Sequence, residues 1–244
     1  MKRALGTAIK KIAQEKIKSE LIANITHEFR TPLAIMRGSI YLATKDIAHK
    51  NNKKHRAAKK ALRAIDEEIE NLSEMLSDLV LITSGDVHRT IELVPINIHQ
   101  IANRAADKLK NLAKKKSIRI YKKGGLKNDF VVGDKKYLER VFLNLIRNAI
   151  TYGGKKIEVS LETKKNNVLV HIKDDGTGIS KDDLPHIFER FFRADKSHNH
   201  DDGHSGLGLP IAKWIIDTHK GSINVKSSLR KGSTFTVTLP LKRD

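Results

Sequence analysis

The sequence has no cysteine, few aromatic residues and no long apolar run, and each absence excludes a class of protein. Without Cys, its 244 residues cannot form a disulfide framework, a thiolate metal site or a thiol nucleophile. The absence also fits a reducing compartment, so we expect a cytoplasmic location. No apolar stretch reaches the roughly 18 residues that a membrane helix needs. Any membrane attachment would therefore come from a region absent from this chain.

The composition is strongly basic, with 47 Lys and Arg residues against 28 Asp and Glu residues and a net charge of +19. A basic surface is a first sign of nucleic-acid binding, and the densest basic stretch is 108–127. Aromatic residues, however, make up only 5% of the chain. No helix-turn-helix, zinc-finger or single-strand-binding pattern accompanies the charge. We therefore favour a solvated lysine-rich surface and expect no nucleic-acid partner.

The first third of the chain has the periodicity of two amphipathic helices. Apolar residues recur every three or four positions from Ile22 to Ala43 and from Ala58 to Ile82, on either side of the polar segment 49–54. This pattern predicts a helical hairpin with one apolar seam per helix. Pairing of two chains into a four-helix bundle would cover both seams. We assign this hairpin to a first domain, residues 1–86.

The pattern changes after about residue 90, where helical and strand-like segments are mixed. We predict an α+β domain over 87–244, with helices on one face of a mainly antiparallel sheet. The predicted helices are 98–112, 135–150 and one that ends at residue 219, and the predicted strands are 117–121, 130–132, 157–163, 168–173, 223–227 and 234–239.

Two asparagines lie one turn apart on the predicted helix 135–150. Asn144 and Asn148 are four residues apart, which puts both amides on one face. An amide oxygen is a suitable ligand for Mg²⁺, which usually keeps substrate phosphates as further ligands.

A carboxylate followed by glycines comes directly after a predicted strand, in the segment DDGTG. Asp174 could accept a hydrogen bond from an exocyclic amine such as that of adenine. Gly176 and Gly178 would let the backbone approach a ligand closely. An ordinary strand-ending turn is the alternative.

A second glycine-rich stretch, GHSGLGLP, leads into the last predicted helix. Amides around Gly206 and Gly208, followed by a helix N-terminus, would form an anion cradle. The spacing is neither a Rossmann fingerprint nor a P-loop. Between the two glycine-rich stretches lies the aromatic segment FERFFR, whose Arg193 offers a cation to a phosphate.

In the first helix, His27 points away from the apolar seam. The string HEFRT around it is not a zinc-binding HExxH motif, because its fifth residue is Thr.

The motifs HEFRTPL, NLIRNA, DDGTGI, FERFFRAD and GHSGLGL, in this order, resemble the transmitter region of a two-component sensor histidine kinase. The resemblance runs from about residue 15 to the end. It implies a dimerisation and phosphotransfer hairpin followed by the α+β sandwich of the GHKL (Bergerat-type) ATP-binding fold. The resemblance also implies ATP as substrate, Mg²⁺ as cofactor, a homodimer, and a response-regulator receiver domain as partner.

The resemblance also assigns roles to individual residues. His27 is the expected phosphoacceptor, Glu28 its general base, and Thr31 the residue that places water for a response-regulator phosphatase activity. Asn148, assisted by Asn144, would hold Mg²⁺. The remaining residues would bind the nucleotide. Tyr152 and Asp174 would contact adenine, and Arg193 would contact phosphate. Four glycines would shape the pocket and its lid: Gly176, Gly178, Gly206 and Gly208.

Other functions stay open at this point. The chain could be a degenerate transmitter that binds nucleotide as a scaffold, or a basic nucleic-acid-binding protein. A metal could also bind the histidine-rich stretch that contains His198, His200 and His204.

Overall fold

The computed structural model describes residues 29, 32–41, 58, 61–66, 68, 69, 72, 73, 76, 91–124, 129–193 and 206–242. The chain divides into two compact units, Met1–Val80 and Leu81–Asp244. The domain boundary expected after residue 86 lies outside the described residues and stays a prediction. Among the described residues, no helix has the length and apolarity needed to cross a bilayer.

The described residues of the first unit are helical, as the apolar periodicity predicts. Several of its large apolar side chains are exposed and recur every seven residues. Leu33 and Ile40 form one such pair, and Leu62, Ile69 and Leu76 form a longer series, each between 49% and 60% exposed. A seven-residue apolar repeat is typical of a helix surface that packs against another helix.

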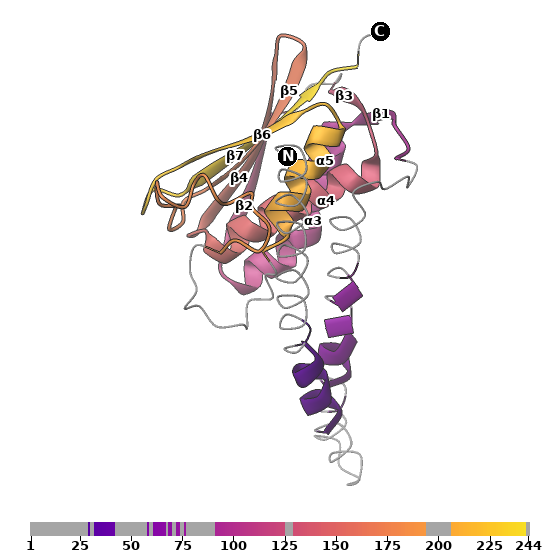
Figure 1. The fold of residues 1–244 in the computed structure, drawn as a ribbon, viewed down its shortest axis with the longest axis vertical. Helices are drawn as coiled ribbons and strands as arrows, with labels where there is room; N and C mark the ends of the chain where they lie inside the picture. Colours follow the sequence, from indigo (N-terminus) through magenta and orange to yellow (C-terminus); the bar gives the residue numbers. More distant parts are fainter. Residues whose placement is uncertain are drawn as a thin grey trace, which may run out of the picture. The chain divides into compact units, whose positions relative to one another are not determined.

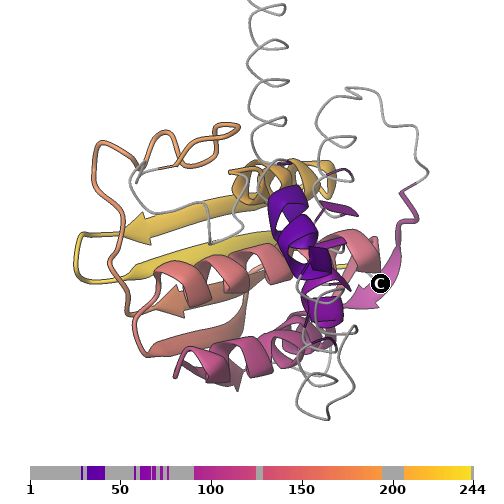
Figure 2. The ribbon, with the colours of Figure 1, turned by 90° about the horizontal axis from the view of Figure 1, so that it is seen from below.

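The described part of the second unit is an α+β sandwich in which helices cover one face of a five-stranded sheet (Figures 1 and 2). The strand order is β2-β4-β5-β7-β6, with β2 parallel to β4 and the other neighbours antiparallel. Strands β1 and β3 pair antiparallel in a separate ribbon. The element bounds are β1 Val94–Asn97, α3 Ile98–Lys115, β2 Arg119–Gly124, β3 Phe130–Gly133, α4 Lys135–Tyr152, β4 Lys156–Lys164, β5 Asn167–Asp174, α5 Gly208–Thr218, β6 Ser222–Ser227 and β7 Ser233–Pro240.

Helices α3 and α4 begin at side chains that cap their first amides. The Asn97 side chain accepts from the N–H of Gln100 at 3.0 Å, and Asp134 accepts from the N–H groups of Lys136 and Tyr137 at 2.8 and 3.2 Å. These bonds satisfy donors that the start of a helix leaves without backbone partners. The α4 cap fixes the start of the helix that carries the two asparagines.

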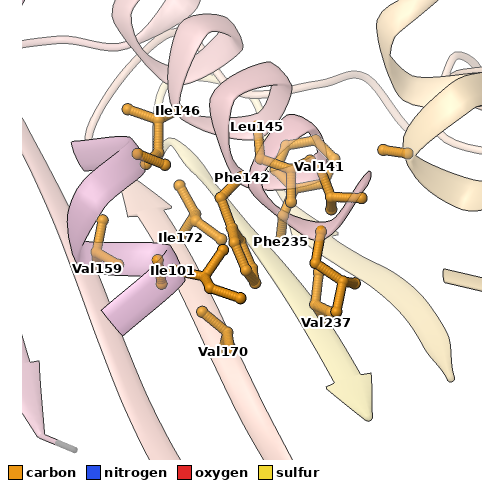
Figure 3. Close-up of a cluster of buried hydrophobic side chains, with 14 of the residues drawn as sticks. Ile101, Val141, Phe142, Leu145, Ile146, Val159, Val170, Ile172, Phe235 and Val237 are labelled. Atoms are coloured by element: carbon orange, nitrogen blue, oxygen red, sulfur yellow. The ribbon is translucent and has the colours of Figure 1, made fainter. Parts of the chain in front are cut away.

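The hydrophobic core lies between the helix layer and the sheet. Phe142 is fully buried and points from α4 toward the sheet, among Ile101 of α3, Ile172 of β5 and Phe235 of β7 (Figure 3). The apolar face of α4 is the one that the sequence periodicity predicts. The sandwich expected from the sequence is therefore confirmed, while the dimeric bundle stays a prediction.

The expected strands and hairpins are present, with small shifts that have local causes. Ser117 adopts a left-handed φ of 58° after α3, so β2 begins at Arg119 rather than at residue 117. The hairpin between β4 and β5 turns through Lys165, whose φ is 55°, and resumes pairing at Asn167. The turn therefore consists of Lys165 and Asn166, between the two expected strands.

Much of the basic stretch 108–127 has a structural role within the second unit. Lys114 and Lys115 lie in the last turn of α3, where positive charge is favourable beside the helix C-terminus. Strand β2 is at the edge of the sheet, and edge lysines discourage pairing with other chains. Three further lysines make ion pairs: Lys108–Glu139 at 3.0 Å, Lys122–Asp107 at 2.6 Å and Lys123–Glu158 at 2.9 Å.

Candidate functional site

Asp174 is a buried carboxylate at the end of β5, only 6% exposed. Its Oδ1 atom accepts from the backbone N–H groups of Gly176 at 2.9 Å and Ser233 at 3.3 Å. Burial raises the pKa of this carboxyl above its ordinary value, against the lowering effect of the two N–H donors. Among the described residues, both donors meet Oδ1, so Oδ2 is the oxygen that we expect to accept from a ligand.

The chain beyond Asp174 is held closely against the end of α4. A Cβ atom at Gly176 would overlap the carbonyl oxygen of Tyr152, so only glycine fits there. Thr177 donates from its N–H to the same oxygen at 3.1 Å. Gly178 has a φ of 69° and passes against the Ser228 carbonyl. These contacts bring Tyr152, which is 47% exposed, beside the loop that follows Asp174.

The two asparagines of α4 lie on its non-core side, and both are partly buried. The Nδ2 atom of Asn144 donates to the carbonyl oxygen of Gly208 at 3.1 Å, which ties α4 to the start of α5. This bond commits the amide nitrogen and leaves the Asn144 oxygen for another partner. A Cβ at Gly208 would meet Asn144 only at van der Waals distance, 3.6 Å. A Cβ at 208 would therefore not clash with Asn144, and glycine there leaves open space beside the Asn144 side chain.

These asparagines fit a hard cation by the chemistry of their donors. Amide oxygens are ligands that Mg²⁺ accepts, and two of them leave coordination positions for phosphate and water. No group of three or more His, Asp or Glu side chains gathers into a metal site in the described part of the chain.

The segment that carries Arg193 contacts the chain just before α5. Phe191 donates from its N–H to the Gly206 carbonyl at 3.1 Å, and both residues have left-handed φ values, 63° and 68°. The Nε atom of Arg193 is buried and has no hydrogen-bond partner among the described residues. A buried cationic donor without a partner is costly, and an anionic ligand would satisfy it.

Sequence reasoning missed four residues that support Asp174. Gly232 has a φ of 78°, and a Cβ there would overlap the Asp174 carbonyl, while the adjacent Ser233 donates to its carboxylate. Ser227 accepts from the N–H of Ile179 at 2.8 Å and so fixes the same loop. Asp175 accepts from two amides beyond α4. Two signals were available in the sequence: the glycine in the β6–β7 connection, and the place of Asp175 inside the DDGTG segment.

Three predicted catalytic residues, His27, Glu28 and Thr31, lie outside the described residues. The histidine-rich stretch with His198, His200 and His204 also lies outside them.

Comparison with known families accounts for both units. Residues 17–86 match the His Kinase A (phospho-acceptor) domain, and residues 133–243 match the histidine kinase-, DNA gyrase B- and HSP90-like ATPase family. The chain belongs to the two-component sensor histidine kinases. Its residues form the transmitter region of such a kinase, and the sandwich is the family's ATP-binding domain.

Named relatives agree with the family assignment. The chain is 30% identical over 97% of its length to the sensor histidine kinase RppB of Synechocystis sp., of which it covers 52%. It is 32% identical over 93% of its length to the sensor-like histidine kinase SenX3 of Mycolicibacterium smegmatis, of which it covers 58%. The chain thus spans little more than half the length of these curated relatives.

A solved structure has the same fold. Full-length ShkA, crystallised in complex with AMPPNP, superposes with a TM-score of 0.67 at 22% identity. The match covers 93% of this chain and 46% of ShkA.

Proposed function

We propose that this chain transfers the γ-phosphoryl group of ATP to His27 and then to an aspartate on a separate response regulator. The observation that carries the proposal is the grouping of Asp174, Tyr152 and the Asn144–Gly208 contact around the end of α4 and the start of α5. Such a site offers an acceptor for adenine at one end and donors for phosphates at the other. The family assignment supplies the phosphoacceptor hairpin.

In this proposal the nucleotide is held by residues at the end of β5, the end of α4 and the start of α5. The 6-amino group of adenine donates to Oδ2 of Asp174, and Tyr152 lies against the ring. The first amides of α5 face the phosphates, because the leucine side chain at its N-cap has no oxygen with which to cap them. Gly206 and Gly208 keep this approach open, and Arg193 adds a positive charge.

Asn148 and Asn144 would hold Mg²⁺ through their amide oxygens. When bound, the ion neutralises charge on the phosphates and orients them. The remaining work of the site is positioning, which the protein's own hydrogen bonds supply.

The chemical step joins His27 to the γ-phosphorus. A ring nitrogen of His27 forms the P–N bond as the P–O bond to ADP breaks, and Glu28 takes the proton that the imidazole gives up. A carboxylate oxygen of the regulator's aspartate then attacks the same phosphorus, which restores His27. Electrons and protons balance without any other reactant.

Labelling with γ-labelled ATP and Mg²⁺ tests this proposal. We expect acid-labile, base-stable label on the parent chain and none on His27→Gln. Asp107→Ala, which removes an exposed carboxylate on α3, should label like the parent. Nucleotide binding without label would favour the scaffold alternative, and steeply salt-dependent duplex binding without label would favour the nucleic-acid alternative.

We also propose that the same hairpin dephosphorylates the regulator, with the Thr31 hydroxyl placing the attacking water. Thr31→Ala should then slow loss of phosphate from a phosphorylated regulator, and Thr31→Ser should retain it. Equal rates for the parent and Thr31→Ala would contradict a phosphatase role for Thr31.

Pairing of two chains completes the proposal. The seven-residue repeat of exposed Leu62, Ile69 and Leu76 supports a homodimer, because a second hairpin would bury these side chains.

A further inference from the structure

Asp175 makes a pair of hydrogen bonds that the proposed chemistry does not use. Its Oδ1 atom accepts from the backbone N–H of Lys155 at 2.9 Å and from that of Lys156 at 2.8 Å. The carboxylate itself is exposed, so it contributes no core packing. Its partners are main-chain amides rather than lysine amino groups: the Lys155 amide lies in the turn between α4 and β4, and the Lys156 amide is at the first residue of β4.

This turn is short and contains two adjacent glycines, Gly153 and Gly154. Glycines give a turn many accessible conformations, so holding one of them needs outside contacts. The Lys155 carbonyl is fixed from the sheet side, where it accepts from the N–H of Arg119 at 2.9 Å. Asp175 fixes the same turn from the side of β5.

The turn and the loop after β5 carry the two groups assigned to adenine. Tyr152 lies immediately before the turn, and Asp174 immediately before Asp175. The N–H of Thr177 donates to the Tyr152 carbonyl at 3.1 Å, and the Cβ of Asp174 would lie 3.4 Å from a Cβ at Gly153. The end of α4 with its turn therefore contacts Asp174 at the end of β5 and Thr177 in the loop that follows, one before and one after Asp175.

We propose that Asp175 is a positioning residue of the nucleotide site, which sets the spacing between Tyr152 and Asp174 by clamping the turn between α4 and β4. This inference rests on the proposed function. Asp175 itself need not touch the nucleotide.

The electrostatics of the clamp agree with this role. The Lys156 and Lys155 amides, the first of them most strongly, hold the pKa of Asp175 below its ordinary value, although desolvation partly opposes them. The carboxylate therefore stays charged throughout the neutral range. Charge-assisted hydrogen bonds are stronger than neutral ones, which suits a clamp on an exposed turn.

The test compares Asp175→Ala, Asp175→Asn and Asp175→Glu in the full chain. Binding of a fluorescent ATP analogue and the dependence of His27 labelling on ATP concentration are measured for each. We expect Asp175→Ala to raise Kd and KM about tenfold, equivalent to about 1.4 kcal/mol, with the labelling rate at saturating ATP near the parent value. Asp175→Asn keeps an acceptor oxygen and should bind nearly as the parent does.

Asp175→Glu separates positioning from charge. It keeps the carboxylate but lengthens the side chain, so it should displace the turn and weaken binding despite the conserved charge. It also serves as the decisive variant if Asp175→Ala does not fold. Asp107→Ala is the matched control, because it removes an exposed aspartate with a lysine partner outside the site.

A double-mutant cycle with Tyr152→Ala completes the test. If Asp175 acts through Tyr152, Asp175→Ala should have a much smaller effect on Kd in the Tyr152→Ala background. Parent-like binding by both Asp175→Ala and Asp175→Glu, or fully additive effects, would overturn the clamp and leave the proposed function intact. Failure of the parent to bind the analogue would overturn both.

Discussion

At the scale of single residues, Asp174 is a carboxylate whose burial disfavours its own charged form. Burial makes its charged form unfavourable, and two backbone donors compensate only in part, so the pKa of its carboxyl is raised. Stability alone would favour a neutral side chain at this position. A buried carboxylate at this position is consistent with the binding role that we propose for Asp174.

Replacing Asp174 by Asn should consequently separate stability from binding. Because the folded pKa lies above the unfolded one, the parent loses stability as pH rises from about 4 through the raised pKa. Asp174→Asn lacks this loss. The free energy of unfolding of Asp174→Asn, minus that of the parent, should therefore be larger at neutral pH than in acid. Urea unfolding at several pH values measures this difference.

The same variant should lose nucleotide affinity, because its amide presents a donor where an acceptor is needed. An Asp174→Asn variant that is less stable than the parent at neutral pH, yet binds nucleotide normally, would contradict this account of Asp174.

The sequence predicts those site residues that are neighbours along the chain. Asp174, Gly176 and Gly178 form one local motif after a strand, and the structure brings them together as expected. Ser233, which donates to the same carboxylate, is 59 residues away and arrives through the pairing of β5 with β7. No local pattern specifies that pairing, so residues of this kind emerge only from the fold.

At the scale of elements, α4 has two faces with different tasks. Phe142 and the other apolar positions pack toward the sheet, while Asn144 and Asn148 lie on the opposite side. The 3.6-residue period predicted this division, because both faces follow from spacing within one helix. The contact between α4 and α5 could not be predicted in this way.

His219, directly after the end of α5, links this helix to the start of α4. It is 4% exposed, and its Nε2 atom accepts from the N–H of Asp134 at 2.9 Å, at the start of α4. Since Nε2 is an acceptor, the proton lies on Nδ1, which donates to the Ile215 carbonyl of α5 at 2.7 Å. An imidazole of one defined tautomer therefore bridges the helices.

We expect His219→Ala to lower the free energy of unfolding by about 1–3 kcal/mol, because it removes a buried side chain and leaves the partly buried N–H of Asp134 without its partner. Denaturant unfolding measures the loss, and ¹⁵N NMR of the parent should show the Nδ1–H tautomer. His186→Ala, at an exposed histidine, is the control and should change stability by about 0.5 kcal/mol or less. Equal stability of the two variants would contradict a bridging role for His219.

At the scale of the whole molecule, each unit carries half of the proposed reaction. The described part of the ATP-binding unit has one continuous buried core, whereas the helical unit exposes a regular series of large apolar residues. A second chain would bury such a series, so we assign the proposed dimerisation to the hairpin.

Disruption of this series should therefore produce monomers. Leu62→Asn combined with Ile69→Asn removes two members of the repeat, and sedimentation equilibrium should then report the monomer mass where the parent reports twice that value. Arg63→Ala, at an exposed position of the same helix, should remain dimeric. A parent chain that is monomeric at micromolar concentration would contradict the dimer.

The central claim is that the nucleotide site around Asp174 phosphorylates His27, and mapping the phosphoryl group tests it most directly. After incubation with ATP and Mg²⁺, peptide mass spectrometry at neutral to basic pH should place one phosphoryl group on His27. The group should be absent from Asp174→Asn and His27→Gln and present on Asp107→Ala. Phosphorylation at another residue, or an unmodified His27 in a parent chain that binds ATP, would contradict the account.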